Sequence, residues 1–267
     1  MARGWGLIII GDEILSGKRQ DRHMAKVIDL LSARGLALDW VRYVGDDPQR
    51  ITATLREAFV SGDVVFSCGG IGATPDDHTR QCAAEACGRP LEAHPEAIAL
   101  IEQRMRELAA SRGETYDAAA PDNIHRMNMG VLPQGATLIP NPYNRIPGFS
   151  VGDVHFVPGF PVMAHPMIEA LLDGCYAAEH GDRQQTERSV LVFEAFEAML
   201  TPLMIELESR FEGIRIFSLP SVDHPVHGRH IELGVKGREP EVGLAFAWLK
   251  QQLEAMPVRL GAELVRP

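Results

Sequence analysis

The chain has 267 residues, of which 45% are hydrophobic and 23% are charged, and its formal net charge is −10. These proportions are typical of a globular protein with one large domain or two smaller ones. The acidic excess is spread along the chain and no basic stripe interrupts it. Nucleic acid is therefore not an expected partner, because binding it depends on lysine and arginine neutralising phosphates.

The N-terminus carries no expected targeting or membrane segment. The apolar run Leu7–Ile10 is too short for a signal-peptide core or a membrane span. We therefore predict a cytoplasmic protein without a membrane partner. The cysteines form no CxxC pair, and we expect them to be buried, reduced thiols. They are Cys68, Cys82, Cys87 and Cys175.

Strands and helices alternate in the first part of the chain. The first six expected elements are a strand at Trp5–Ile10, a helix at Asp21–Arg34, a strand at Leu36–Val44, a helix from Pro48 to Gly62, a strand at Asp63–Cys68 and a helix from Thr74 to Cys87. Further helices are expected at 95–112, 122–129 and 163–172, with strands at 136–139 and 154–157. This order predicts right-handed crossovers and a mostly parallel sheet covered by helices on both faces.

The pattern changes after residue 176. The polar stretch 177–187 is expected to be a linker. The elements expected beyond it are strands at 189–193, 214–218 and 230–235 and helices at 201–211 and 241–256. We therefore predict two domains, 1–176 and 188–267, the second a small ferredoxin-like α+β unit of unknown role.

The clearest chemical feature is the glycine loop Gly69-Gly70-Ile71-Gly72, which follows a buried strand and precedes a helix. Glycines let the backbone turn tightly and approach a ligand. The amides of such a loop, together with the free donors of the next helix, form an anion site even in an acidic protein. We predict that Gly69, Gly70, Gly72 and Thr74 contact a small anionic, phosphate-bearing molecule.

Acidic side chains beside this loop have two interpretations. Asp77 is three residues after Thr74, a spacing that favours a capping box, and the alternative is a carboxylate that holds Mg²⁺ against ligand phosphates. Asp46 follows the second strand and has no evident capping task, whereas Asp47 precedes Pro48 and is expected to cap a helix. Asp46 and Asp77 are thus the candidate catalytic and metal-binding residues, expected to converge on one divalent cation at the carboxyl edge of the sheet.

The segment that follows the first strand ends at the same edge. Gly11, Asp12 and Glu13 belong to it and are candidate ligand-binding residues. The carboxylates are equally suited to holding the loop by accepting hydrogen bonds from backbone amides.

Seven ordered blocks of the sequence resemble the N-terminal half of the competence/damage-inducible protein CinA, which is similar to the molybdopterin-binding domain of MoaB and MogA. The blocks are Gly11–Gly17, Val44–Asp47, Gly69–Thr79, Leu132–Ala136, Ile139–Pro142, Pro147–Phe149 and Phe156–Pro161. The resemblance implies a three-layer α/β/α domain that binds molybdopterin or a nucleotide. It adds Asn141, Arg145, Pro158, Gly159 and Pro161 to the ligand-binding candidates, and homologous domains suggest a homo-oligomer, for which we assume a dimer.

The family resemblance leaves the activity open. In MogA-like members the pterin phosphate is adenylylated with Mg²⁺, whereas CinA-type proteins are associated with hydrolysis of the ADP-ribose pyrophosphate. Here Ile71 and Ala73 replace the family Leu and Pro, His23 replaces an Asn, and Asn144–Gly148 replaces Gly-Thr-Ala-Pro-Gly. We favour a molybdopterin- or nucleotide-binding protein, with a metal-dependent pyrophosphatase and a non-catalytic assembly protein as alternatives.

Two features of the C-terminal part bear on function. The deamidase domain that ends full-length CinA has no counterpart in residues 188–267. His224, His227 and His230 lie in one segment and are a candidate Zn²⁺ site, but Pro225 and Gly228 favour a solvated hairpin loop instead.

Overall fold

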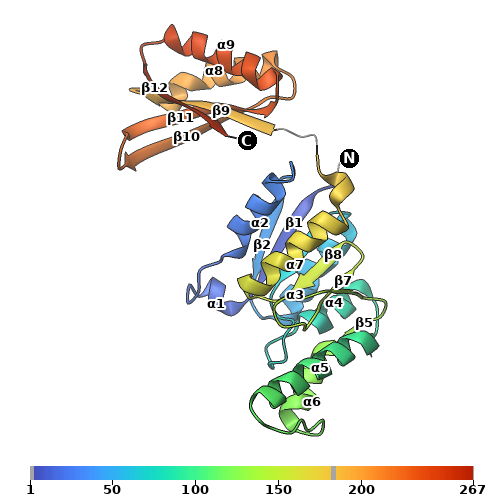
Figure 1. Cartoon of the computed structure of the whole chain (residues 1–267). Helices are drawn as coiled ribbons and strands as arrows, with labels where there is room; N and C mark the ends of the chain where they lie inside the picture. The colour runs from blue at the N-terminus through green and yellow to red at the C-terminus, as the bar shows by residue number, and fades with distance from the viewer. Residues whose placement is uncertain (1–2, 182–184, 267) are drawn as a thin grey trace. The chain divides into compact units, whose positions relative to one another are not determined.

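The computed structural model describes residues 3–181 and 185–266. The chain divides into two compact units, Met1–Glu179 and His180–Pro267, both drawn in Figure 1. The stretch 177–187 expected as a linker contains a short 3₁₀ helix, η2 (Ala177–Glu179), and the start of a strand at Gln185, while 182–184 lie outside the described residues. None of the helices described combines the length and apolar character needed to cross a lipid bilayer.

A six-stranded sheet forms the centre of the first unit. Its spatial order is β2-β1-β3-β8-β7-β6, and the pairs among β2, β1, β3 and β8 are parallel, as the sequence predicted. The two strands at one edge pair antiparallel. The bounds are β1 Trp5–Ile10, β2 Trp40–Val44, β3 Val64–Cys68, β6 Thr137–Ile139, β7 Gly148–Val151 and β8 Val154–Val157.

Helices cover both faces of this sheet, which gives the expected three layers. Alternate residues of β1 divide between two cores: Leu7 packs on one face and Ile8 on the other. The first core includes residues of α2 (His23–Ser32) and α7 (Pro161–Gly174), and the second includes residues of α3 (Pro48–Ser61) and α4 (Thr79–Cys87). Burial on both faces explains why β1 is a continuous apolar run.

Some element boundaries differ from those predicted. Helix α2 begins at His23, two residues late, because the Asp21 carboxylate accepts hydrogen bonds from the amides of His23 (2.7 Å) and Met24 (3.1 Å) ahead of it. Strand β2 begins at Trp40. The helix predicted from Thr74 begins only at Thr79, because residues 74–77 form a separate turn. The predicted cap at Asp47 is present: its carboxylate accepts from the Arg50 amide at 2.8 Å.

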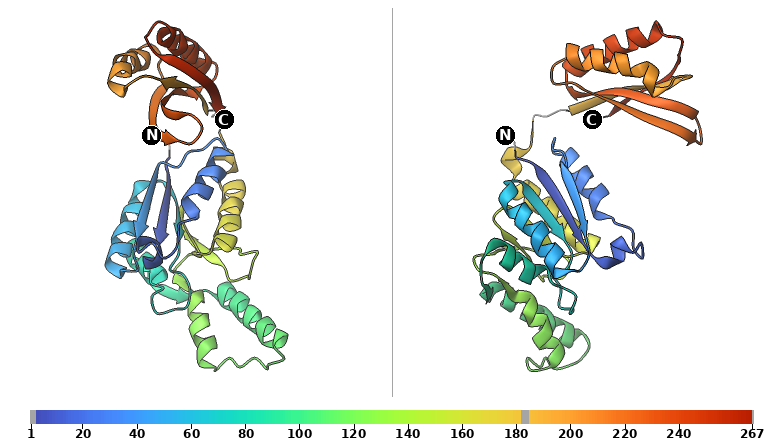
Figure 2. Two further views of the ribbon diagram at one scale, coloured as in Figure 1. Left: turned by 90° about the vertical axis from the view of Figure 1, so that its left-hand side faces the viewer. Right: turned by 180° about the vertical axis from the view of Figure 1, so that it is seen from behind.

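A helical insertion separates α4 from the last strands of the sheet. It consists of β4 (Leu91–Ala93), α5 (Pro95–Ser111), α6 (Pro121–Met127), the 3₁₀ helix η1 (Asn128–Gly130) and β5 (Val131–Pro133). Strands β4 and β5 pair antiparallel at its base. Figures 1 and 2 show α5 and α6 side by side beyond the end of the central sheet, with α1 (Asp12–Leu15) at the tip of β1.

The second unit is a four-stranded antiparallel sheet with both helices on one face (Figure 2). Its elements are β9 Gln185–Phe193, α8 Glu197–Arg210, β10 Arg215–His224, β11 Gly228–Arg238, α9 Glu241–Glu254 and β12 Arg259–Arg266. The spatial order β10-β11-β9-β12 is that of a ferredoxin-like unit, as predicted. The last strand was not predicted.

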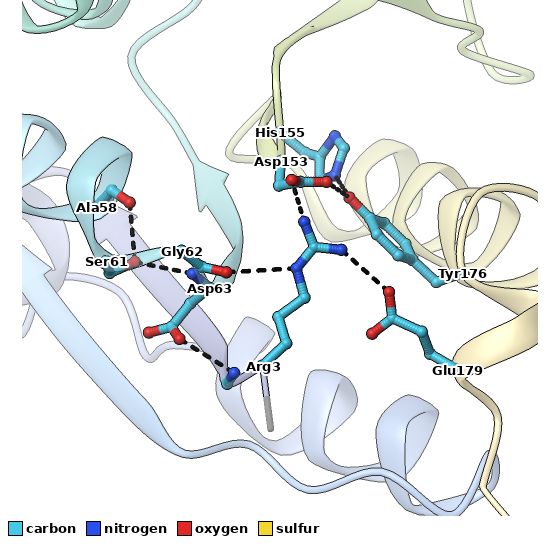
Figure 3. Close-up of polar contacts among 10 residues, drawn as sticks. Arg3, Ala58, Ser61, Gly62, Asp63, Asp153, His155, Tyr176 and Glu179 are labelled. Carbon is cyan, nitrogen blue, oxygen red and sulfur yellow. Dashed lines mark hydrogen bonds and ion pairs between the residues drawn. The ribbon is translucent and has the colours of Figure 1, made fainter. Parts of the chain in front are cut away.

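A chain of hydrogen-bonded polar side chains lies in the first unit, and Figure 3 shows its members His155, Tyr176, Asp153 and Arg3. Ser150, His155 and Tyr176 are buried, whereas Asp153 and Arg3 are partly exposed. Ser150 Oγ lies 2.7 Å from His155 Nδ1, and His155 Nε2 lies 2.5 Å from the Tyr176 hydroxyl. That hydroxyl donates to Asp153 Oδ1 at 2.9 Å, and Arg3 pairs with the other Asp153 oxygen. Because Tyr176 donates to the carboxylate, it accepts from His155, so the imidazole proton is on Nε2 and Nδ1 accepts from Ser150.

Arg3 extends this polar chain to two other segments. Its guanidinium also contacts Glu179 Oε1 at 3.0 Å and the Gly62 carbonyl at 3.3 Å (Figure 3). The residue therefore ties the start of β1 to the loop before β3 and to η2. Burial lowers the pKa of His155 from 6.5 to about 4, so its imidazole stays neutral near pH 7.

We predict that this histidine makes the protein less stable in acid. Between pH 6.5 and 4 His155 is protonated in the unfolded chain but neutral in the folded protein. The free energy of unfolding should therefore fall by about 3 kcal/mol as the pH drops through this window. His155→Gln should remove this part of the pH dependence of the free energy of unfolding, as measured by urea unfolding at several pH values. His125→Gln, which replaces an exposed histidine of α6, is the control; equal slopes in the His155→Gln and wild-type proteins would contradict the prediction.

Candidate functional site

The glycine loop leaves β3 in a conformation that only glycine adopts without strain. Gly69 and Gly70 have φ angles of 110° and 69°. The Thr79 hydroxyl donates to the Gly69 carbonyl and the Thr79 amide to the Gly70 carbonyl, each at 3.0 Å. A Cβ atom on Gly70 would lie 2.2 Å from Thr79 Oγ1. Thr79, the first residue of α4, thus leaves room only for glycine at position 70.

A buried arginine holds the other end of the loop. Arg80 is 5% exposed, and its guanidinium donates to the Gly72 carbonyl at 2.8 Å and to the Asn128 carbonyl. Burial lowers the pKa of Arg80, while the nearby Asp77 carboxylate acts in the opposite direction. Sequence reasoning missed this residue, because an arginine inside an amphipathic helix is usually solvated.

The loop amides are free as a result. Within 3–181 and 185–266, no partner accepts a hydrogen bond from the amides of Gly70, Ile71, Gly72 or Ala73. The N–H of a trans peptide points opposite to its C=O. Because the carbonyls of Gly69, Gly70 and Gly72 are held by Thr79 and Arg80, the N–H groups of the residues that follow them point away from the protein body.

These amides border a pocket of about 380 Å³. Predicted site residues contribute to its wall from three segments. They are Gly70, Gly72, Thr74, Asp77, Asn141, Pro158 and Gly159. Apolar side chains complete the pocket, among them Met129, Ile146 and Met163. The pocket is thus bordered by the polar loop, by asparagines and by apolar side chains.

Asp77 is held beside the pocket by Thr74. Its Oδ2 accepts from the Thr74 amide at 2.8 Å and from the Thr74 hydroxyl at 2.5 Å. The capping-type contact considered for this pair is therefore formed, but in a turn two residues before α4. A Cβ atom on Gly72 would lie 2.5 Å from the same oxygen, so this glycine leaves room for the carboxylate.

Asp46 lies in the loop that follows β2. Its carboxylate and that of Asp12 each accept a hydrogen bond from the backbone amide of the other residue. The Asp12 amide donates to Asp46 Oδ2 at 2.9 Å, and the Asp46 amide donates to Asp12 Oδ1 at 3.2 Å. Burial raises the pKa of Asp46, and the nearby charges of Asp12, Glu13 and Asp76 act in the same direction. Asp77 lines the pocket of the glycine loop and Asp46 does not, although Asp76, the neighbour of Asp77, lies close enough for its charge to act on the Asp46 carboxylate.

The remaining candidates are distributed around this edge of the sheet. The Gly11 amide donates to the Val44 carbonyl at 3.0 Å, while Glu13 and Pro161 line a neighbouring pocket. Gly69, the first residue of the loop, does not line the pocket, and its amide donates to the Val157 carbonyl at 3.0 Å.

Asn141 and Arg145 belong to the loop across the pocket, and both use their polar atoms on the protein itself. Asn141 Nδ2 donates to Asn144 and to the Ile146 carbonyl, so it shapes this loop. Arg145, predicted as a phosphate contact, forms an ion pair with Glu107 of α5 at 2.6 Å.

Metal-binding clusters of three or more His, Cys, Asp or Glu side chains do not occur among the residues described. The rings of His224, His227 and His230 do gather, with centroids 4.9 to 5.9 Å apart. Nδ1 of His224 accepts from the amides of Val226 and His227, which fits a hairpin loop. Among the cysteines, Cys68 and Cys82 are buried as expected, but Cys175 is exposed and the expectation of burial was wrong there.

Comparison with known proteins identifies the class of the first unit. The family model described as "Probable molybdopterin binding domain" matches residues 6–176, and the chain belongs to this family. A CinA-like protein of Desulfovibrio desulfuricans is 36% identical over 61% of this chain and 37% of its own length. The solved structure of CinA from Thermoplasma acidophilum, described as being of unknown function, covers 64% of this chain and 97% of its own at 28% identity, with a TM-score of 0.54.

The two units occur together in relatives of similar length. A protein of Pyrobaculum calidifontis is 29% identical over 93% of this chain and 94% of its own length. By contrast, the chain spans 37% of the D. desulfuricans protein and 46% of a CinA-like protein of Syntrophotalea carbinolica. The resemblance to CinA stated from the sequence is thereby confirmed for the first unit.

The conformation of the glycine loop gives a stability prediction. Gly17 has nearly the same φ as Gly70, 71° against 69°, but a Cβ atom there would meet nothing within 4 Å. Gly17→Ala should therefore cost only the left-handed backbone strain, about 1 kcal/mol. Gly70→Ala adds the clash with Thr79 and should cost about 3 kcal/mol. Urea unfolding measures both; equal losses would show that Thr79 does not constrain the loop.

Proposed function

We propose that the first unit binds a phosphate-bearing small molecule of the molybdopterin or nucleotide class at the glycine loop. The observation that carries this proposal is the row of unpaired amides from Gly70 to Ala73 beside a pocket large enough for a heterocycle. Neutral amides attract an anion without help from surface lysines or arginines. A net charge of −10 is therefore compatible with an anionic ligand.

The buried guanidinium strengthens this site. Arg80 lies directly behind the loop, donating to the Gly72 carbonyl. Its positive charge acts at short range and in surroundings that screen it less than water does. It also fixes the Gly72–Ala73 peptide, so the Ala73 N–H is oriented before a ligand arrives, which lowers the entropic cost of binding.

The pocket wall suits the other part of such a ligand. Met129, Ile146 and Met163 offer apolar contact area, and methionine adapts well to flat rings. Pro158 and Gly159 border the same space, and Gly159 lies next to Gly69 of the loop, where an added Cβ would be 3.4 Å from the Gly69 Cα atom. A pterin or purine ring in this space would bring an attached phosphate to the loop amides.

A divalent cation was expected from the sequence between Asp46 and Asp77, but each of these side chains has a partner within the protein. Asp77 Oδ2 is occupied by Thr74, and Asp46 is paired with Asp12 at a different loop. Since the residues described contain no larger ligand cluster, we derive no step through a metal ion. Hydrolysis of a pyrophosphate, which would rely on such an ion, is correspondingly less well supported than binding.

We predict that a negative charge beside the loop weakens binding. Ala73→Glu places a carboxylate where the ligand phosphate should lie, while Ala73→Gln adds the same bulk without the charge. The dissociation constant of AMP, measured calorimetrically in EDTA, should rise about tenfold or more for Ala73→Glu relative to Ala73→Gln. Equal affinities in the two variants would place the phosphate elsewhere.

Asp77→Asn separates binding by amides from binding through a cation. Asparagine still offers Thr74 an acceptor, so the turn should remain. If amides hold the phosphate, removing the nearby negative charge should leave AMP affinity in EDTA unchanged or raise it about two- to fivefold. A loss of affinity that occurs only with Mg²⁺ present would instead show that Asp77 holds a cation.

A further inference from the structure

A second pocket of about 390 Å³ adjoins the pocket of the glycine loop. Gly159 and Phe160 line both, so the two spaces are separated only by this short segment between β8 and α7. Arg19, Arg22 and His23 also line the second pocket. Phe160 is 56% exposed although it is a large apolar residue, and it belongs to the wall of both pockets.

The two arginines of this pocket are unpaired. Across the described part of the chain, neither Arg19 nor Arg22 forms an ion pair or a side-chain hydrogen bond. Glu13, the acidic residue in the same wall, lies against Gly11, where its Oε2 would be 2.4 Å from an added Cβ. Two exposed arginines without an ion pair or a side-chain hydrogen bond among the described residues thus line one pocket, in a protein with ten more negative than positive charges. Arginine binds phosphate and carboxylate groups in paired, charge-assisted hydrogen bonds.

His23 fixes the segment that the two pockets share. It is 4% exposed, and its Nε2 lies 3.1 Å from the Gly159 carbonyl. A carbonyl only accepts, so Nε2 carries the proton. Burial lowers the pKa of His23, so the ring adds no charge to the pocket near neutral pH. The attraction for an anion therefore comes from the arginines, and His23 acts as a positioning residue for Gly159.

We infer that Arg19 and Arg22 form a second anion subsite, which receives a further phosphate or carboxylate group of the molecule held at the glycine loop. This inference rests on the proposed function, because the first group must lie at the loop amides. The consequence is selectivity: ligands with several anionic groups bind more tightly than those with one. Residues 19 and 22 then determine specificity while the glycine loop provides the anchoring contact.

The test compares AMP, ADP and ATP on the full-length protein by calorimetry in EDTA at constant ionic strength. In the wild type the affinity should rise about tenfold or more from AMP to ATP. In Arg19→Gln/Arg22→Gln the three nucleotides should bind with similar affinity, and AMP should stay within about threefold of wild type. The control is Arg215→Gln/Arg238→Gln, which removes the same charge from exposed positions of the second unit and should keep the wild-type series.

The outcomes distinguish the subsite from the glycine-loop site. If AMP binds but ATP binds no more tightly, or if the preference survives in Arg19→Gln/Arg22→Gln, the subsite is overturned while the proposed function stands. If none of the nucleotides binds the wild type, both are overturned for this ligand class. If the control loses the preference equally, the effect is general charge attraction and the subsite is overturned. Circular dichroism and melting temperatures verify that each variant is folded.

Discussion

The candidate site depends on three carbonyl groups whose oxygens accept hydrogen bonds from residues that do not line the pocket. Thr79 donates hydrogen bonds to the carbonyls of Gly69 and Gly70, and Arg80 donates to the carbonyl of Gly72. With the oxygens fixed toward the protein body, the N–H groups point toward the pocket and cannot rotate inward to find partners. The proposed anion site therefore depends on the first two residues of α4, although neither Thr79 nor Arg80 lines the pocket.

The rest of the first unit keeps these residues in place. Strand β3 is buried along its whole length, and β1 and β8 pair on either side of it. The strand therefore fixes the position of the loop relative to the sheet. The helical insertion contributes the Asn128 carbonyl, the second acceptor for Arg80, and Met129 of the pocket wall. Far from the pocket, Arg3 and the polar chain through His155 hold the opposite end of the same strands.

The sequence predicted the parallel sheet and the loop because both follow from local patterns: buried apolar runs and three glycines after one of them. It predicted the wrong start for α4, since Thr74 and Asp77 have the same spacing in a capping box and in an isolated turn. It also missed Arg80, whose role depends on a hydrogen bond to the carbonyl of Asn128, 48 residues later in the chain. Strand β12 was missed because it is largely exposed and contains Gly261, so it shows little alternation. Whether Asp46 and Asp77 meet was a question of tertiary geometry that spacing along the chain does not answer.

The buried arginine behind the loop has a consequence for protein design. Copying Gly69–Gly72 into another α/β scaffold would transfer the flexibility of the glycines but not the orientation of their peptides. A grafted site would also need a threonine and an arginine at the start of the next helix, and a carbonyl from a separate segment to satisfy the second arm of the guanidinium. The transferable unit is thus a strand end, a helix start and one distant backbone oxygen, rather than a short glycine motif.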